Sequence, residues 1–199
     1  EVYGDIKKNY KSKEEDAYNP SSPYSASKAS GDLLIKSYIR TYKIPAIITN
    51  CCNNFGPNQY PEKLIPTIIY NILNKKPIPI YGKGENLREW IYVKDHCEAL
   101  IKVSEKGIIG ENYNIGSGHK TTIDDLAKLV KHEYAIAAEP KFGTMEGRLW
   151  DMPDWFANPS KAKHVLGWSA TTTLNEGLLI TANWVASLSN EDFISSTKK

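Results

Sequence analysis

The sequence has few cysteines and no metal-binding motif. Its 199 residues include only Cys51, Cys52 and Cys97, an adjacent pair and a distant third. This spacing is neither a disulfide framework nor a set of metal ligands, and the four histidines are far apart in the chain. We therefore expect free thiols in a reducing cytoplasm and no metal site.

The sequence also lacks an excess of charge and a long apolar run. Its 25 basic and 23 acidic residues leave a net charge of +2, and the lysines are scattered along the chain. No positive surface of the kind that binds nucleic acid is expected, and any anionic partner should be small. Lys, Asn or Pro interrupts every apolar stretch well before the about 20 residues that a membrane span requires. We expect neither a nucleic-acid partner nor a membrane span.

Apolar periodicity predicts alternating helices and strands. Residues 1–4 are typical of the end of a strand, a long helix is predicted from Pro23 to about Tyr42, and a strand follows at 46–49. This order is the crossover unit of a parallel sheet, which indicates an α/β fold. Further helices are expected at about 63–74, 95–105, 122–134, 159–167 and 174–187, and short extended segments at 77–81, 91–93 and 112–115.

Tyr24 and Lys28 are four residues apart, which places a phenol and an ammonium on one face of the first helix. Ser22 can cap this helix with Pro23 at its first position, which fixes where the helix begins. A tyrosine is a weak base at neutral pH unless a nearby cation stabilises its phenolate. The pattern fits a redox enzyme, but on spacing alone a solvated helix start is the more common explanation.

Four segments in order resemble the extended short-chain dehydrogenase/reductase family, and most closely its dTDP-glucose 4,6-dehydratase branch. The likeness is strong over about residues 1–130 and loosens beyond them. The segments are Glu1-Val2-Tyr3-Gly4, Tyr24-x-x-x-Lys28, Asn53-Asn54-Phe55-Gly56-Pro57 running on to Pro66, and Pro79-Ile80-Tyr81-Gly82 with Arg88-Glu89-Trp90-Ile91-Tyr92-Val93.

The resemblance implies the C-terminal part of a Rossmann-type parallel-sheet domain, here residues 1–60, and a smaller mixed α/β substrate-binding domain, residues 61–199. The glycine-rich turn that holds the pyrophosphate of a dinucleotide in such folds has no counterpart in the sequence. We therefore expect a fragment of a longer enzyme that does not hold NAD tightly and is inactive alone.

The implied chemistry is a redox-neutral cycle on a nucleotide-diphosphate sugar. NAD oxidises C4, water leaves across C5 and C6, and C6 is reduced. By similarity, Tyr24 is the base at the C4 hydroxyl, Lys28 holds its phenolate and the nicotinamide ribose, and Asn50 contacts the cofactor. Glu1 matches the last residue of a Thr-Asp-Glu run and is the implied C5 base, a role suited to one of two carboxyl groups in different protonation states.

The resemblance also implies a substrate site and a homodimer. A guanidinium at Arg88 and an ammonium at Lys63 suit the two negative charges of a diphosphate. A four-helix interface that includes the helix at 23–42 would join two subunits. Each substrate residue alone also has an ordinary structural explanation, such as a helix cap or a core leucine. The implied substrate residues are Asn53, Lys63, Leu64, Pro79, Tyr81, Arg88 and Arg148.

Two departures from the family pattern leave the exact substrate open. Asp154 stands where the family has a second arginine, which reverses a charge near the expected nucleotide, and Thr122 replaces an asparagine. A sugar-nucleotide epimerase or decarboxylase shares Tyr24 and Lys28 but needs no paired carboxyl groups. A catalytically silent sugar-nucleotide-binding module is the alternative of a different class.

Overall fold

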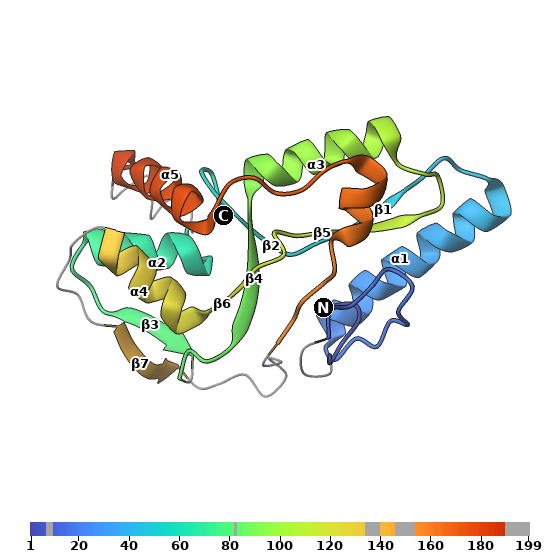
Figure 1. Ribbon diagram of the computed structural model, residues 1–199. Helices are drawn as coiled ribbons and strands as arrows, with labels where there is room; N and C mark the ends of the chain where they lie inside the picture. The colour runs from blue at the N-terminus through green and yellow to red at the C-terminus, as the bar shows by residue number, and fades with distance from the viewer. Residues whose placement is uncertain (7–9, 82, 134–139, 146–153, 190–199) are drawn as a thin grey trace.

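A computed structural model of the chain describes residues 1–6, 10–81, 83–133, 140–145 and 154–189. Parallel strand pairs with helices packed beside them make up most of it (Figure 1). The predicted α/β class is confirmed. The division into domains at residue 60 stays a prediction.

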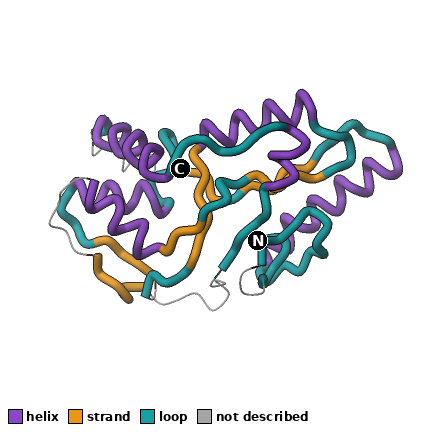
Figure 2. Tube along the Cα trace, in the orientation of Figure 1, coloured by secondary structure: helices purple, strands orange, loops and turns teal. Residues whose placement is uncertain are grey.

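The strands pair mainly in parallel. β1 pairs with β5, β2 with β4 and β3 with β7, whereas β6 runs antiparallel to β4. Figure 2 shows the paired strands in orange between the purple helices. The strands are β1 (Ile48–Cys51), β2 (Asn53–Phe55), β3 (Ile78–Tyr81), β4 (Leu87–Tyr92), β5 (Asn112–Ile115), β6 (Lys120–Thr122) and β7 (Pro140–Met145).

The helices fall into two groups in space. Besides α1, the helices α2, α4 and α5 pack on one another with α2 and α4 against β3, whereas α3 packs on η1, β2 and β4, and η1 on β5 (Figure 1). Each group encloses an apolar cluster, one built largely from isoleucines of α2 and the other around Tyr113 and Trp168. The helices are α1 (Pro23–Tyr42), α2 (Leu64–Leu73), α3 (Val93–Lys106), α4 (Ile123–Glu133), the short π-helix η1 (Ala162–Leu166) and α5 (Leu174–Ser187).

Helices with local start signals match the predictions well. α1 begins with Ser22 as its cap, whose Oγ accepts a hydrogen bond from the Ser25 amide at 3.1 Å, and with Pro23 in its first turn. The hydroxyl of Thr122 likewise accepts from the Asp125 amide at 3.0 Å where α4 begins. None of the described helices is both long and apolar enough to cross a membrane.

Two local predictions were wrong because distant contacts decide the structure. Residues 1–4 form a turn, not a strand end, with the Gly4 amide donating to the Glu1 carbonyl at 3.0 Å and Gly4 at a φ of +69°. The helix predicted from about residue 95, with Asp95 as its possible cap, already begins at Val93 as α3, so Asp95 lies within its first turn. Its buried carboxylate instead accepts hydrogen bonds from the amide and hydroxyl of Thr172, 77 residues away, at 2.9 and 3.0 Å.

A clamp of buried polar contacts ties the segment 10–16 to β5. Asn114, which is fully buried, accepts from the Tyr3 hydroxyl at 2.9 Å and donates its side-chain amide to the Ser12 carbonyl at 3.1 Å. Its backbone amide donates to the Glu14 carboxylate at 2.8 Å. Ser12 in turn donates its amide to the carbonyl of Phe156 at 2.9 Å. β5, the segment 10–16 and Phe156 are therefore joined by buried hydrogen bonds.

Candidate active site

Tyr24 and Lys28 lie side by side on the first turns of α1, as predicted. The ammonium of Lys28 is 5.5 Å from the centre of the Tyr24 ring, and 61% of Tyr24 is exposed. Asp32 follows one turn further along and accepts a hydrogen bond from the Tyr18 hydroxyl at 2.9 Å. The face of α1 that carries these three residues borders a cavity.

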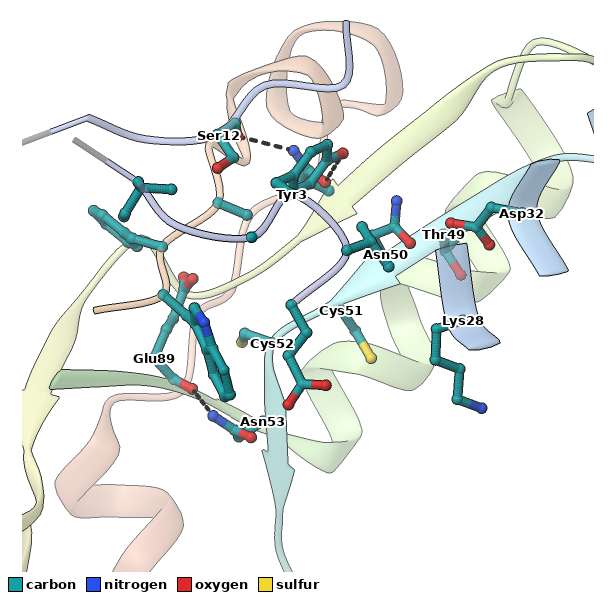
Figure 3. A pocket seen from close by; sticks show the side chains of 18 of the residues that line it. Tyr3, Ser12, Lys28, Asp32, Thr49, Asn50, Cys51, Cys52, Asn53 and Glu89 are labelled. Atoms are coloured by element: carbon teal, nitrogen blue, oxygen red, sulfur yellow. Dashed lines mark hydrogen bonds between the residues drawn. The ribbon is translucent and has the colours of Figure 1, made fainter. Parts of the chain in front are cut away.

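The cavity has a volume of about 520 Å³, within the range of small-molecule sites. Its lining comes from the first six residues and Ser12, from α1, from the consecutive strands β1 and β2, from Glu89 of β4 and Asn114 of β5, and from residues 155–157. In Figure 3, Lys28 and Asp32 border it on one side, Tyr3 and Ser12 on another, and Glu89 with Asn53 on a third. Tyr24, Lys28 and Glu1, the predicted catalytic residues, all belong to this lining.

Asn50 and Asn53 present amide groups at the same cavity. The side-chain nitrogen of Asn50 is buried at the cavity wall. Burial raises the pKa of the Tyr3 and Tyr18 hydroxyls, and this nearby amide opposes the rise at both. The side-chain nitrogen of Asn53 donates to the backbone carbonyl of Glu89 at 3.1 Å. Both residues were implied by the resemblance, Asn50 for a cofactor and Asn53 for a substrate.

Among the described side chains, the predicted substrate residues Arg88, Lys63 and Leu64 do not line the cavity. Arg88 is only 7% exposed, and its guanidinium stacks 4.3 Å from the centre of the Trp155 ring. Lys63 is exposed and pairs with Glu62 at 3.8 Å, next to Leu64 at the start of α2. Pro79 and Tyr81 belong to β3, but their side chains are outside the described part, as is the whole of Arg148.

The charge reversal at Asp154 is compensated within the fold. Lys120 on β6 forms an ion pair with the Asp154 carboxylate at 2.5 Å, and both side chains are about four-fifths buried. The same ammonium lies 4.9 Å from the centre of the Phe156 ring. A negative charge at position 154 is therefore neutralised by an ammonium from a neighbouring strand, which reduces its repulsion of a phosphate.

Burial shifts the pKa of two groups in the cavity wall. The pKa of Glu89 rises to about 7, mainly because burial disfavours its charged form, although the Gly118 amide opposes the shift. The pKa of Tyr3 rises to about 12 for the same main reason. Neither residue was singled out from the sequence, although Glu89 lies directly beside Arg88 in a quoted segment. Their hydrogen bonds join them to Gly118 and Asn114, 29 and 111 positions away in the sequence.

The two adjacent cysteines differ in environment. Cys51 is exposed at the end of β1, whereas burial, and next the nearby Glu89 charge, raises the pKa of Cys52 well above its ordinary value. Iodoacetamide at neutral pH is expected to alkylate Cys51 and Cys97 at least about 10-fold faster than Cys52, because the thiolate is the reactive form. Mass spectrometry of the peptides measures the three rates. Equal rates at Cys52 and Cys97 would contradict the described burial.

Comparison with known proteins adds relatives in sequence and in structure. A dTDP-glucose 4,6-dehydratase of Escherichia coli is 42% identical over 181 residues, which are 86% of this chain and 50% of that protein. The chain thus spans about half the length of this curated relative. A crystal structure of dTDP-glucose 4,6-dehydratase from Bacillus anthracis in complex with NAD superposes with a TM-score of 0.90 at 37% identity, covering 99% of this chain and 62% of that one.

A UDP-glucuronic acid 4-epimerase from Bacillus cereus, solved with UDP-glucuronic acid and NAD, is also similar, with a TM-score of 0.87 at 28% identity over 93% of this chain and 58% of that one. Residues 1–181 match the family described as GDP-mannose 4,6 dehydratase. The resemblance read from the motifs is thereby confirmed at the level of the family. With nine-tenths of its length matched, the chain belongs to the GDP-mannose 4,6-dehydratase family.

Proposed function

We propose that this protein is a nucleotide-sugar 4,6-dehydratase that uses NAD and a substrate like dTDP-glucose. The observation that carries the proposal is the placement of Tyr24, Lys28 and Glu1 around one cavity. A general base with a cation beside it suits C4 oxidation, and a separate carboxylate suits removal of the C5 proton, while a second, protonated carboxyl group would supply the proton that leaves with the C6 hydroxyl as water. The names of the similar dehydratases support the same assignment.

The residues present fit the nicotinamide half of NAD. The amide of Asn50, the ammonium of Lys28 and the hydroxyl of Tyr24 line one cavity and suit ribose hydroxyls and a carboxamide. When bound, NAD supplies reversible hydride transfer. The sequence offers no glycine-rich turn for the pyrophosphate, so these 199 residues alone are proposed to hold the cofactor weakly and to be inactive.

The chain's own residues have separable tasks in this proposal. Tyr24 takes the proton of the C4 hydroxyl, and the ammonium of Lys28, 5.5 Å from its ring, stabilises the resulting negative charge. Glu1 takes the proton from C5, which is acidic once C4 is a ketone. Asn53 orients the sugar nucleotide from the opposite wall. The remaining substrate contacts are proposed because these residues match family positions that hold the nucleotide sugar. They are Lys63, Leu64, Pro79, Tyr81, Arg88 and Arg148.

An epimerase of the same family is the second candidate. The similarity to the UDP-glucuronic acid 4-epimerase favours it, and Tyr24 with Lys28 would serve either reaction. The full-length natural protein should be incubated with NAD and dTDP-glucose, and separately with UDP-glucose and UDP-glucuronic acid. A 4-keto-6-deoxy sugar, detected by its chromophore in alkali, is the expected product. Inversion at C4 without that chromophore would favour the epimerase, and no product from any sugar would indicate a silent binding module.

We also propose a cytoplasmic homodimer. The second half of α1 exposes a group of large apolar side chains, most of them on one face, which suits an interface between subunits. All three cysteines are free thiols, as expected in a reducing compartment. Light scattering of the full-length protein should give twice the subunit mass. The exposed residues are Leu33, Leu34, Ile35, Tyr38 and Tyr42.

A further inference from the structure

The carboxyl group of Glu89 is buried in the cavity wall and has no task in the proposed reaction. Only 2% of this residue is exposed. Its Oε1 accepts a hydrogen bond from the Gly118 amide at 2.6 Å and lies 3.5 Å from the Ser117 hydroxyl. The backbone amide of Ala157 also interacts with the carboxyl and, like that of Gly118, opposes the rise that burial causes in its pKa. The side chain therefore fastens β4 to the turn at 116–118.

Glu89 binds a second residue, Asn53, through its backbone carbonyl. Its carbonyl accepts the hydrogen bond from the Asn53 side chain at 3.1 Å, and Asn53 lines the cavity. Residue 89 is thus joined through its side chain to the turn after β5 and through its carbonyl to the start of β2. A shift of Glu89 would carry the Asn53 amide with it.

Gly116 leaves the space that the Glu89 carboxyl occupies. A Cβ atom at position 116 would lie 2.4 Å from Oε1 of Glu89, which is far inside van der Waals contact. The backbone of Gly116 is not in the left-handed region, so a side chain there would displace the carboxyl without straining the local backbone. A larger side chain at position 116 could therefore be accommodated by a shorter one at position 89.

We propose that Glu89 is a positioning residue of this active site, whose carboxyl fixes the turn at 116–118 and whose carbonyl thereby holds the Asn53 amide in place for the nucleotide sugar. The inference rests on the proposed function and adds a residue to it. Glu89 acts on the substrate through Asn53.

The protonation of Glu89 gives this role a measurable signature. Its pKa of about 7 means that the carboxyl ionises close to neutral pH, and the ionised form accepts the stronger hydrogen bond from Gly118. Lys11 and Cys52 interact electrostatically with it from the segments packed against β4. On the paired strand β6, Lys120 stands opposite Glu89 and forms an ion pair with Asp154, whereas the turn 116–118 and residues 155–157 contain no charged side chain. Positioning of Asn53 should weaken as the pH falls through about 7.

The first test is a mutant cycle in the full-length enzyme with dTDP-glucose. Glu89→Gln keeps the shape but not the charge, and it should raise KM about 10-fold while kcat changes less than about 2-fold. The KM of the wild type should rise below pH 7, and that of the variant should stay flat. In an Asn53→Ala background, Glu89→Gln should raise KM no further, because the effect passes through Asn53. Glu98→Gln, on the exposed side of α3, is the matched control.

The second test exchanges size between the paired positions. Gly116→Ala alone should raise KM, and Gly116→Ala with Glu89→Asp should lower it again, because the shorter side chain leaves room for the new methyl group. Additive effects in the Asn53 cycle, or an unchanged KM in Glu89→Gln enzyme that merely melts at a lower temperature, would overturn the inference. No turnover of any nucleotide sugar by the wild type would instead overturn the proposed function, and the inference with it.

Discussion

Turnover of dTDP-glucose should fall at least about 100-fold when Tyr24 is replaced by phenylalanine in the full-length enzyme, because the phenol is the proposed base at the C4 hydroxyl. The ring and its contact with Lys28 at 5.5 Å are kept, so binding of the nucleotide sugar should change little. Steady-state kinetics measures the first quantity, and calorimetric titration with dTDP, which carries no reacting sugar, measures the second.

Tyr60→Phe is the matched control for this experiment. It removes the same hydroxyl at a position that is 62% exposed and is not part of the cavity lining. Its turnover should equal that of the wild type. A Tyr24→Phe enzyme with normal turnover would show that another group removes the proton. The proposal that Lys28 stabilises the phenolate of Tyr24 during the reaction would then be wrong.

Replacing Glu1 by glutamine in the full-length enzyme should separate oxidation from elimination. The amide cannot take the C5 proton, so formation of the 4-keto-6-deoxy product should fall at least about 100-fold. Oxidation at C4 relies on Tyr24 and Lys28 and should continue, so that reduced nicotinamide accumulates and is seen by its absorbance. Deuterium from heavy water should no longer enter the sugar at C5.

The control for Glu1 is the same change at Glu105, which is 51% exposed on α3 and pairs with Lys102 at 3.0 Å on the surface. This variant should form product at the wild-type rate. If Glu1→Gln enzyme still eliminated water and exchanged the C5 proton normally, the assigned C5 base would be wrong, whereas loss of reduced nicotinamide as well would indicate a role in substrate binding.

Elements with local start and stop signals could be predicted from the sequence. Ser22 and Pro23 define the beginning of α1, and the apolar spacing of α5 gave both of its ends. Contacts between distant residues could not be predicted in this way. Asp95 looks like a helix cap in the sequence, but its hydrogen bonds with Thr172 exist only after the chain has folded back on itself.

In the candidate site, too, residues within short motifs could be predicted, and residues that depend on distant contacts could not. Residues carried by short motifs, namely Tyr24, Lys28, Asn50, Asn53 and Glu1, line one cavity as a set. The wall that surrounds them was not predicted, because Tyr3, Glu89 and Asn114 acquire their roles from partners up to 111 residues away. Asp154 illustrates the difference. Its sequence position suggests a repulsive charge, but Lys120 on a neighbouring strand neutralises it.

The clamp at β5 has a consequence for how the enzyme is made. Tyr3, Ser12, Asn114 and Phe156 meet in space, so the cavity has no complete wall until residue 157 has emerged from the ribosome. Such long-range closure is slow compared with helix formation. A nascent chain stalled before Phe156 would therefore display Tyr24 and Lys28 on a finished helix without yet having a chamber in which they can act.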